Sequence, residues 1–116
     1  MNFNKVTQGA RTAAFLLNEG NGERSREQIL LLKGATALPS GQILSKNPAG
    51  KYIVFVAPAE GVAVEVAILY EGRDADAAND RPATGIVRDC EVIESLLVGL
   101  TDPAKVALAS AGIILR

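Results

Sequence analysis

The sequence predicts a mainly β fold: a small domain of short strands with one short C-terminal helix, preceded by an extended N-terminal arm. From residue 34 onward, short apolar runs alternate with clusters of Gly, Pro, Asn and Ser, which is the pattern of short strands joined by turns. Near the C-terminus, one segment carries the residues that begin and end a helix. The chain of 116 residues has the length of a single domain.

Residues 1–33 are predicted to form the arm, and residues 34–116 the compact β domain. The two parts differ in charge: the first carries five basic and three acidic side chains (+2), the second seven basic and ten acidic ones (−3). The first twelve residues contain only Phe3 and Val6 as sizeable apolar groups, too few to offset the entropy lost on ordering. We therefore expect a mobile N-terminus in the isolated protein.

Two apolar runs of the arm, residues 14–17 and 29–32, flank a polar, Gly-rich stretch. The Asn21-Gly22 pair within that stretch adopts positive φ easily, which favours a hairpin or loop. A capping box from Ser25 to Gln28 would instead begin a helix, but the run that follows soon meets Gly and Pro. The pattern favours extended structure.

Five further segments are predicted as strands, because each is short, rich in aliphatic residues and bounded by turn residues. They are residues 42–46, 51–57, 62–70, 86–87 and 92–93. Residues 52–56 are apolar on both faces, which is typical of a strand covered on both sides, by its own domain and by a neighbouring chain. Residues 72–82 are polar and rich in Ala, and they predict a surface loop.

The C-terminal helix has the clearest signature in the chain. Thr101 or Asp102 is a suitable N-cap, and Pro103 fits the first helical position. Strong helix formers follow, and Gly112 stands where a left-handed residue ends a helix. Residues 113–115 then predict a terminal strand.

The composition excludes several classes of function. The chain has no histidine and a single cysteine, Cys90, so a His-based triad, an intramolecular disulfide and a Cys/His zinc site are all excluded. A net charge of −1 and a pI near 5.4 argue against nucleic acid as a partner. No run approaches the ~18 apolar residues of a membrane span, so no membrane partner is expected and synthesis is expected in the cytoplasm.

Three motifs resemble parts of metal-binding, phosphate-binding or catalytic sites. Asp74, Asp76 and Asp80 begin like a calcium-binding loop, but the following positions lack the required oxygen ligand, Gly and Glu. The Gly50-Lys51 pair lacks the rest of a phosphate-binding loop. Acidic pairs such as Glu91 with Glu94 are typical of a solvated surface. The sequence therefore predicts no catalytic residue, no metal and no cofactor.

Aliphatic residues are more abundant than one small core requires. The apolar fraction is 48 %, yet aromatic residues make up only 4 %. Small domains have a large surface relative to their volume, and monomers rarely expose a wide apolar patch. The surplus predicts an interface between copies of the chain.

The order of segments along the chain resembles the lambda-type bacteriophage head decoration protein D family. The resemblance extends from about residue 12 to the C-terminus. It is carried by Phe15-Leu16-Leu17-Asn18-Glu19, by residues 21–27, by Leu38, Gly41, Ile43-Leu44 and Gly50-Lys51-Tyr52, by Gly61, Ile68-Leu69-Tyr70 and Asp74-Ala75-Asp76, and by Ile86-Val87-Arg88-Asp89, Leu108-Ala109 and Gly112-Ile113.

This resemblance implies a non-enzymatic cement protein with a β-clip-like domain. Such a protein forms homotrimers and binds the major capsid protein on the outer surface of an expanded phage head, at three-fold and quasi-three-fold positions. There it stabilises the virion against internal DNA pressure. The family's capsid-binding arm corresponds here to residues 1–33, with the expected contacts Phe15, Leu16, Leu17, Asn18, Glu19, Arg24 and Arg26.

The sequence leaves two other functions open. One is a trimeric β-clip nucleotide hydrolase, which would need a catalytic Asp and phosphate-binding motifs that we do not find in the sequence. The other is an interaction module of β structure that is unrelated to phage. Binding to capsids distinguishes the cement protein from both.

Overall fold

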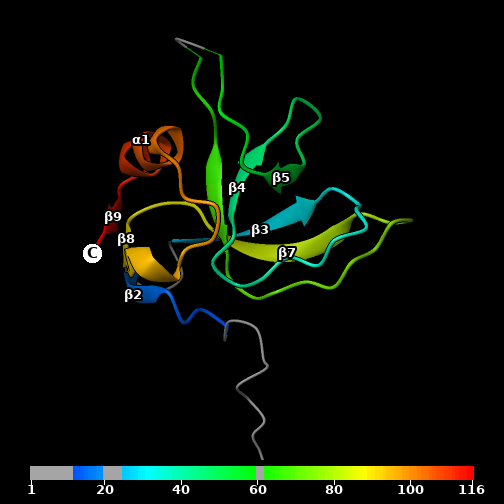
Figure 1. Ribbon diagram of the computed structural model, residues 1–116, viewed down its shortest axis with the longest axis horizontal. Helices are drawn as coiled ribbons and strands as arrows, with labels where there is room; N and C mark the ends of the chain where they lie inside the picture. Colours follow the sequence, from blue (N-terminus) through cyan, green and yellow to red (C-terminus); the bar gives the residue numbers. More distant parts are fainter. Residues whose placement is uncertain (1–11, 20–24, 60–61) are drawn as a thin grey trace, which may run out of the picture.

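The computed structural model describes residues 12–19, 25–59 and 62–116. Five strands close into a barrel in the order β3-β5-β4-β6-β7, and three form a separate sheet in the order β2-β8-β9. The sheet and the helix α1 lie on one side of the barrel (Figure 1). The elements are β2 (Leu16–Glu19), β3 (Arg26–Leu31), β4 (Ile43–Lys46), β5 (Tyr52–Val54), β6 (Val66–Leu69), β7 (Arg81–Ile86), β8 (Cys90–Val92), the 3-10 helix η1 (Glu94–Leu96), α1 (Asp102–Ser110) and β9 (Ile113–Leu115).

The prediction of a mainly β domain with one short C-terminal helix is confirmed. Thr101 is the N-cap of α1, and its hydroxyl oxygen accepts a hydrogen bond from the backbone N–H of Ala104 at 3.3 Å. Pro103 takes the second helical position, one later than predicted, because the helix begins at Asp102. Gly112 has a φ of +80°, as expected for the residue that ends the helix.

Strands β4 and β6 contribute to two hydrophobic cores at once. Ile43 and Ile68 face the core shared with the sheet and α1, whereas Leu44 and Leu69 face the barrel interior. Because successive side chains of a strand point to opposite faces, a strand between two cores is apolar at every position. All four residues are fully buried. Two-sided burial was predicted for residues 52–56, but within this chain it applies to β4 and β6, and Val54 of β5 is 48 % exposed.

Strand β7 begins at Arg81, inside the predicted surface loop of residues 72–82, and ends at Ile86, which was predicted as strand, so the loop ends two residues earlier than predicted. Residues 81–86 pair with β3 at six positions, although their sequence contains no apolar alternation. The cause is Arg81, which is 9 % exposed and donates hydrogen bonds to the carbonyl oxygens of Leu32, Thr36 and Asp74 at 2.9–3.1 Å. These bonds satisfy backbone groups of two connecting segments, the one between β3 and β4 and the one between β6 and β7, so a charged side chain stabilises the start of this strand.

Parts of the predicted arm, residues 1–33, pack against the predicted domain. Phe15 is 1 % exposed and lies in the core beside the sheet, and β3 is a wall of the barrel. The compact domain therefore includes residues 15–19 and 26–31 as well as residues 34–116. Each apolar run of the expected arm is too short for a core of its own, but each packs against strands far along the chain. The predicted turn at residues 21–22 lies outside the described residues.

Two predicted strands are shorter than expected. Residues 52–54 and 66–69 form β5 and β6, whereas 51–57 and 62–70 were predicted. The described residues between them, 55–59 and 62–65, project from the barrel at the top of Figure 1. High β propensity becomes a strand only where a neighbouring strand is available to pair.

Replacing Gly112 by Val tests the end of the helix. The change is expected to cost about 1–2 kcal/mol, because a β-branched residue is strained at positive φ. An added Cβ would also lie 2.7 Å from Asp89 Oδ1. Gly50→Val is the matched control, since Gly50 has a φ of +85° and no heavy atom within 4 Å of an added Cβ. Thermal unfolding should show a larger loss for Gly112→Val, and an unchanged midpoint for that variant would contradict the assigned conformation.

Candidate functional site

The structure separates the seven residues that were expected to bind capsid. Phe15 is buried in the core and Leu16 is half-buried against it, so neither presents a free side chain. Leu17 is 53 % exposed, and Asn18 is also exposed. Arg24 lies outside the described residues. Among the expected contacts seen in the structure, Leu17 and Asn18 are the most accessible.

The remaining two expected contacts, Glu19 and Arg26, are bonded to each other. Arg26 Nη2 lies 2.7 Å from Glu19 Oε1, and its Nε donates to Glu19 Oε2 at 3.1 Å. The Arg26 guanidinium also stacks 4.5 Å from the centroid of the Tyr70 ring. This bidentate pair joins β2 to β3, and thereby the sheet to the barrel. Both side chains are thus used within the fold.

Strand β2 forms one edge of the three-stranded sheet, with β8 on its other side. Within the described part of the chain, no strand pairs with its outer edge. Residue 93, just before η1, donates its backbone N–H to the Phe15 carbonyl at 2.7 Å, so η1 lies close to where the chain enters β2. Leu96 of η1 is 44 % exposed. The outer edge of β2, with the exposed Leu17, is one candidate interaction surface.

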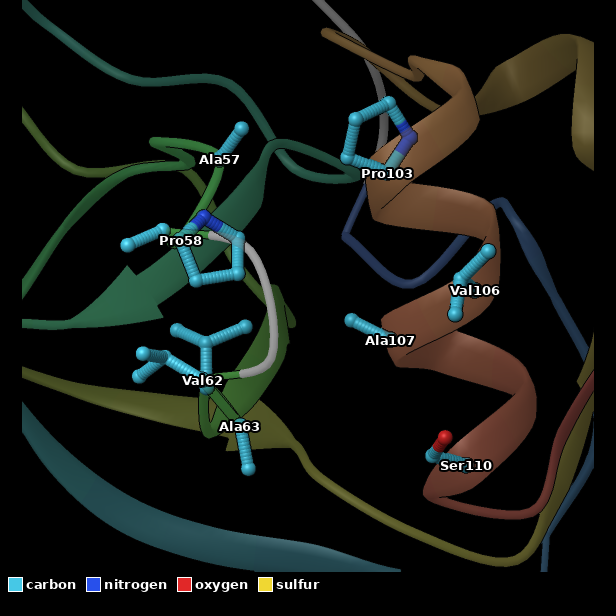
Figure 2. Close-up of a pocket in the computed structure, with 10 residues that line it drawn as sticks. Ala57, Pro58, Val62, Ala63, Pro103, Val106, Ala107 and Ser110 are labelled. Carbon is cyan, nitrogen blue, oxygen red and sulfur yellow. The ribbon is translucent and has the colours of Figure 1, made fainter.

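A second candidate surface is an apolar groove between the projecting loop and α1 (Figure 2). Its cavity volume is about 330 Å³. Side chains from the loop face those of the helix across an open space (Figure 2). The lining residues are all uncharged: Ala57, Pro58, Ala59, Val62, Ala63, Val64, Pro103, Val106, Ala107 and Ser110. The groove offers no group for acid–base or nucleophilic chemistry and is suited to contact with another apolar surface.

The sequence contains a signal for this groove that the prediction missed. Pro103, Val106, Ala107 and Ser110 recur at the spacing of one helix face, opposite the buried Ala104 and Leu108. A helix that is apolar on two faces packs on both. Val106 is 68 % exposed, the most exposed large apolar residue among those described.

Two aspartates of the 74–80 loop, Asp76 and Asp80, form contacts within the chain. Asp76 Oδ1 accepts hydrogen bonds from two backbone N–H groups, of Ala78 and Asn79, which lowers the pKa of that carboxyl. Asp80 forms an ion pair with Lys51 at 2.6 Å and accepts from the Lys33 backbone, and its pKa is lowered too. Over residues 12–19, 25–59 and 62–116, no cluster of His, Cys, Asp and Glu could hold a metal ion.

Cys90 is buried, and desolvation raises the pKa of its thiol from 9.0 to about 12. The folded state therefore holds this proton more tightly than the unfolded state. Its contribution to stability is complete below pH 9 and is lost as the pH rises from about 9 to about 12.

We expect Cys90→Ala to show a weaker loss of stability than the parent between pH 9 and 10. Burial also raises the pKa of Tyr52, but this effect is common to both proteins and begins above pH 10. Urea unfolding at a series of pH values measures the difference. Identical pH profiles below pH 10 would contradict the assignment.

No helix in the described part of the chain is long and apolar enough to cross a membrane. A family model described as bacteriophage lambda head decoration protein D matches residues 5–113. No curated protein and no solved structure matches the chain significantly.

Proposed function

The chain belongs to the bacteriophage lambda head decoration protein D family, and we propose that it binds the outer surface of an expanded phage head as trimers. The trimers would occupy three-fold and quasi-three-fold positions and stabilise the shell against internal DNA pressure. The observation that carries this proposal is the family match over residues 5–113, which includes both the sheet and the barrel. The family is one of structural proteins, and an uncharged groove is consistent with a role in assembly.

We propose that the N-terminal end of the chain makes the contact with the major capsid protein. In this proposal, residues 1–11 and the exposed Leu17 and Asn18 of β2 provide the contact surface. An edge strand can accept a strand from another protein through backbone hydrogen bonds, and exposed side chains beside it provide specificity. Phe15, Glu19 and Arg26 would act indirectly, because they fix β2 to the domain.

Reconstitution on heads tests the function. Expanded heads that lack the protein should bind it to saturation, and density should appear at the three-fold positions in images of the decorated heads. Decorated heads packed with DNA should retain that DNA at temperatures that empty undecorated ones. Saturation binding at other positions, or no gain in DNA retention, would contradict the proposal.

A further inference from the structure

The described parts of the projecting loop combine apolar side chains with few backbone hydrogen bonds to other described residues. In its described parts, residues 57–59 and 62–64, one backbone hydrogen bond joins two described residues, from Val62 N–H to Ala59 O. The sequence here has the β-branched content of a strand, yet no described strand pairs with it. Val56 and Val62 are 58 % and 56 % exposed. An exposed apolar segment that pairs with no described strand is typical of an element that completes its contacts in an assembly.

The two sides of this loop differ in shape. On one side, Val62 and the residues around it face α1 across the apolar groove (Figure 2). On the other side, Val56 lies over a second hollow, which the β4–β5 turn also lines. The loop thus lines a hollow on each side, and Val56, which is 58 % exposed, lines only the second of them.

A closed ring of identical subunits needs two unlike, complementary surfaces on each subunit. We infer that the side of the loop carrying Val56 packs into the groove of a second copy, against Val106 of that copy's α1, and that three such contacts close the proposed trimer. This inference rests on the proposed homotrimer and adds the surface that forms it. Both surfaces lie on this one chain, and all residues lining the groove are uncharged.

The position of the loop favours a second copy over the capsid as the occupant. In Figure 1 the loop projects at the top, and β2 lies at the lower left of the domain. If the N-terminal end contacts the capsid, the loop is directed away from that contact. Three copies around one axis could then join through their loops while each N-terminal end stays accessible.

Substitution with lysine tests the groove. Val106→Lys places a charge on the most exposed large apolar residue of the groove, and we expect it to raise the dissociation constant of the trimer by roughly 30-fold or more, as for a central interface residue. Ile114→Lys is the matched control, because Ile114 is 47 % exposed on β9 and does not line the groove. Analytical ultracentrifugation over a concentration series measures the dissociation constant, and circular dichroism verifies that both variants fold.

Cross-linking tests the pairing of the two surfaces. Val56→Cys and Val106→Cys are made as separate proteins in a Cys90→Ser background and then mixed under oxidising conditions. We expect a covalent dimer that contains one chain of each kind, at a yield well above that of either protein alone. Because each chain carries one cysteine, no intramolecular disulfide can form.

The outcomes separate this inference from the proposed function. If the parent is a trimer but Val106→Lys has no effect on it and the mixture gives no cross-link, the inference is overturned and the trimer stands. If Val106→Lys leaves the trimer intact but abolishes binding to heads, the groove contacts capsid and the inference is again overturned. If the parent is a monomer at all concentrations and on heads, the homotrimer itself fails.

Discussion

Deletion of residues 1–11 is expected to leave a folded protein that keeps its oligomeric state but loses decoration of expanded heads. The described fold begins close to this boundary: the backbone N–H of Ala13 donates to the Tyr70 carbonyl at 2.9 Å, and its Ser40 contact measures 3.0 Å. The cut leaves both of these contacts in place. If each of three N-terminal segments binds capsid, the loss of all three removes an avidity of about 10²-fold or more. Binding of fluorescently labelled protein to undecorated heads measures the change.

Two variants make this deletion interpretable. Leu17→Asp changes the exposed edge of β2 without removing any of the chain, and it should also weaken binding. Lys5→Ala with Arg11→Ala should weaken binding more at low salt than at high salt, because salt screens the attraction between charges. A truncated protein that still saturates heads at the parent's affinity would show that the globular domain makes the contact.

Phe15→Ala is expected to destabilise the domain by about 3–5 kcal/mol, the range for removing a buried aromatic side chain from a core. Phe15 is 1 % exposed and packs among residues of the barrel, the sheet and α1. A loss of this size is a large fraction of the ~5–15 kcal/mol that stabilises a typical domain. Urea unfolding at neutral pH measures it.

Leu17→Ala is the control for Phe15→Ala, because Leu17 lies two residues away and is 53 % exposed. Its loss should stay below about 1 kcal/mol, as for most surface substitutions. Equal effects of the two changes, or a small effect of Phe15→Ala, would show that residues 14–17 belong to the arm and not to the core. For the same reason, a deletion that extends through residue 20 is expected to impair folding, since it removes Phe15 and all of β2.

Local chemistry was sufficient to predict several elements. The helix from Asp102 to Ser110 is specified by its own residues: a Thr that caps its first turn, a Pro that its beginning accepts, and a Gly at positive φ after its end. The central residues of β4, β5 and β6 were correctly predicted as strands, because short aliphatic runs between turn residues indicate strands. The order of such segments along the chain also predicted the family.

Tertiary structure decided the features that depend on partners distant in sequence. Phe15 belongs to the core because Ile43, Ile68 and other residues far along the chain surround it, and nothing near Phe15 indicates this. Arg81 makes a polar segment into a strand through carbonyl groups 7 to 49 residues away. By itself, the sequence determined a mainly β domain, its helix and its lack of histidine-based chemistry. Only the fold decided which apolar residues are buried and which stay exposed, because burial depends on packing between distant segments and not on local propensity.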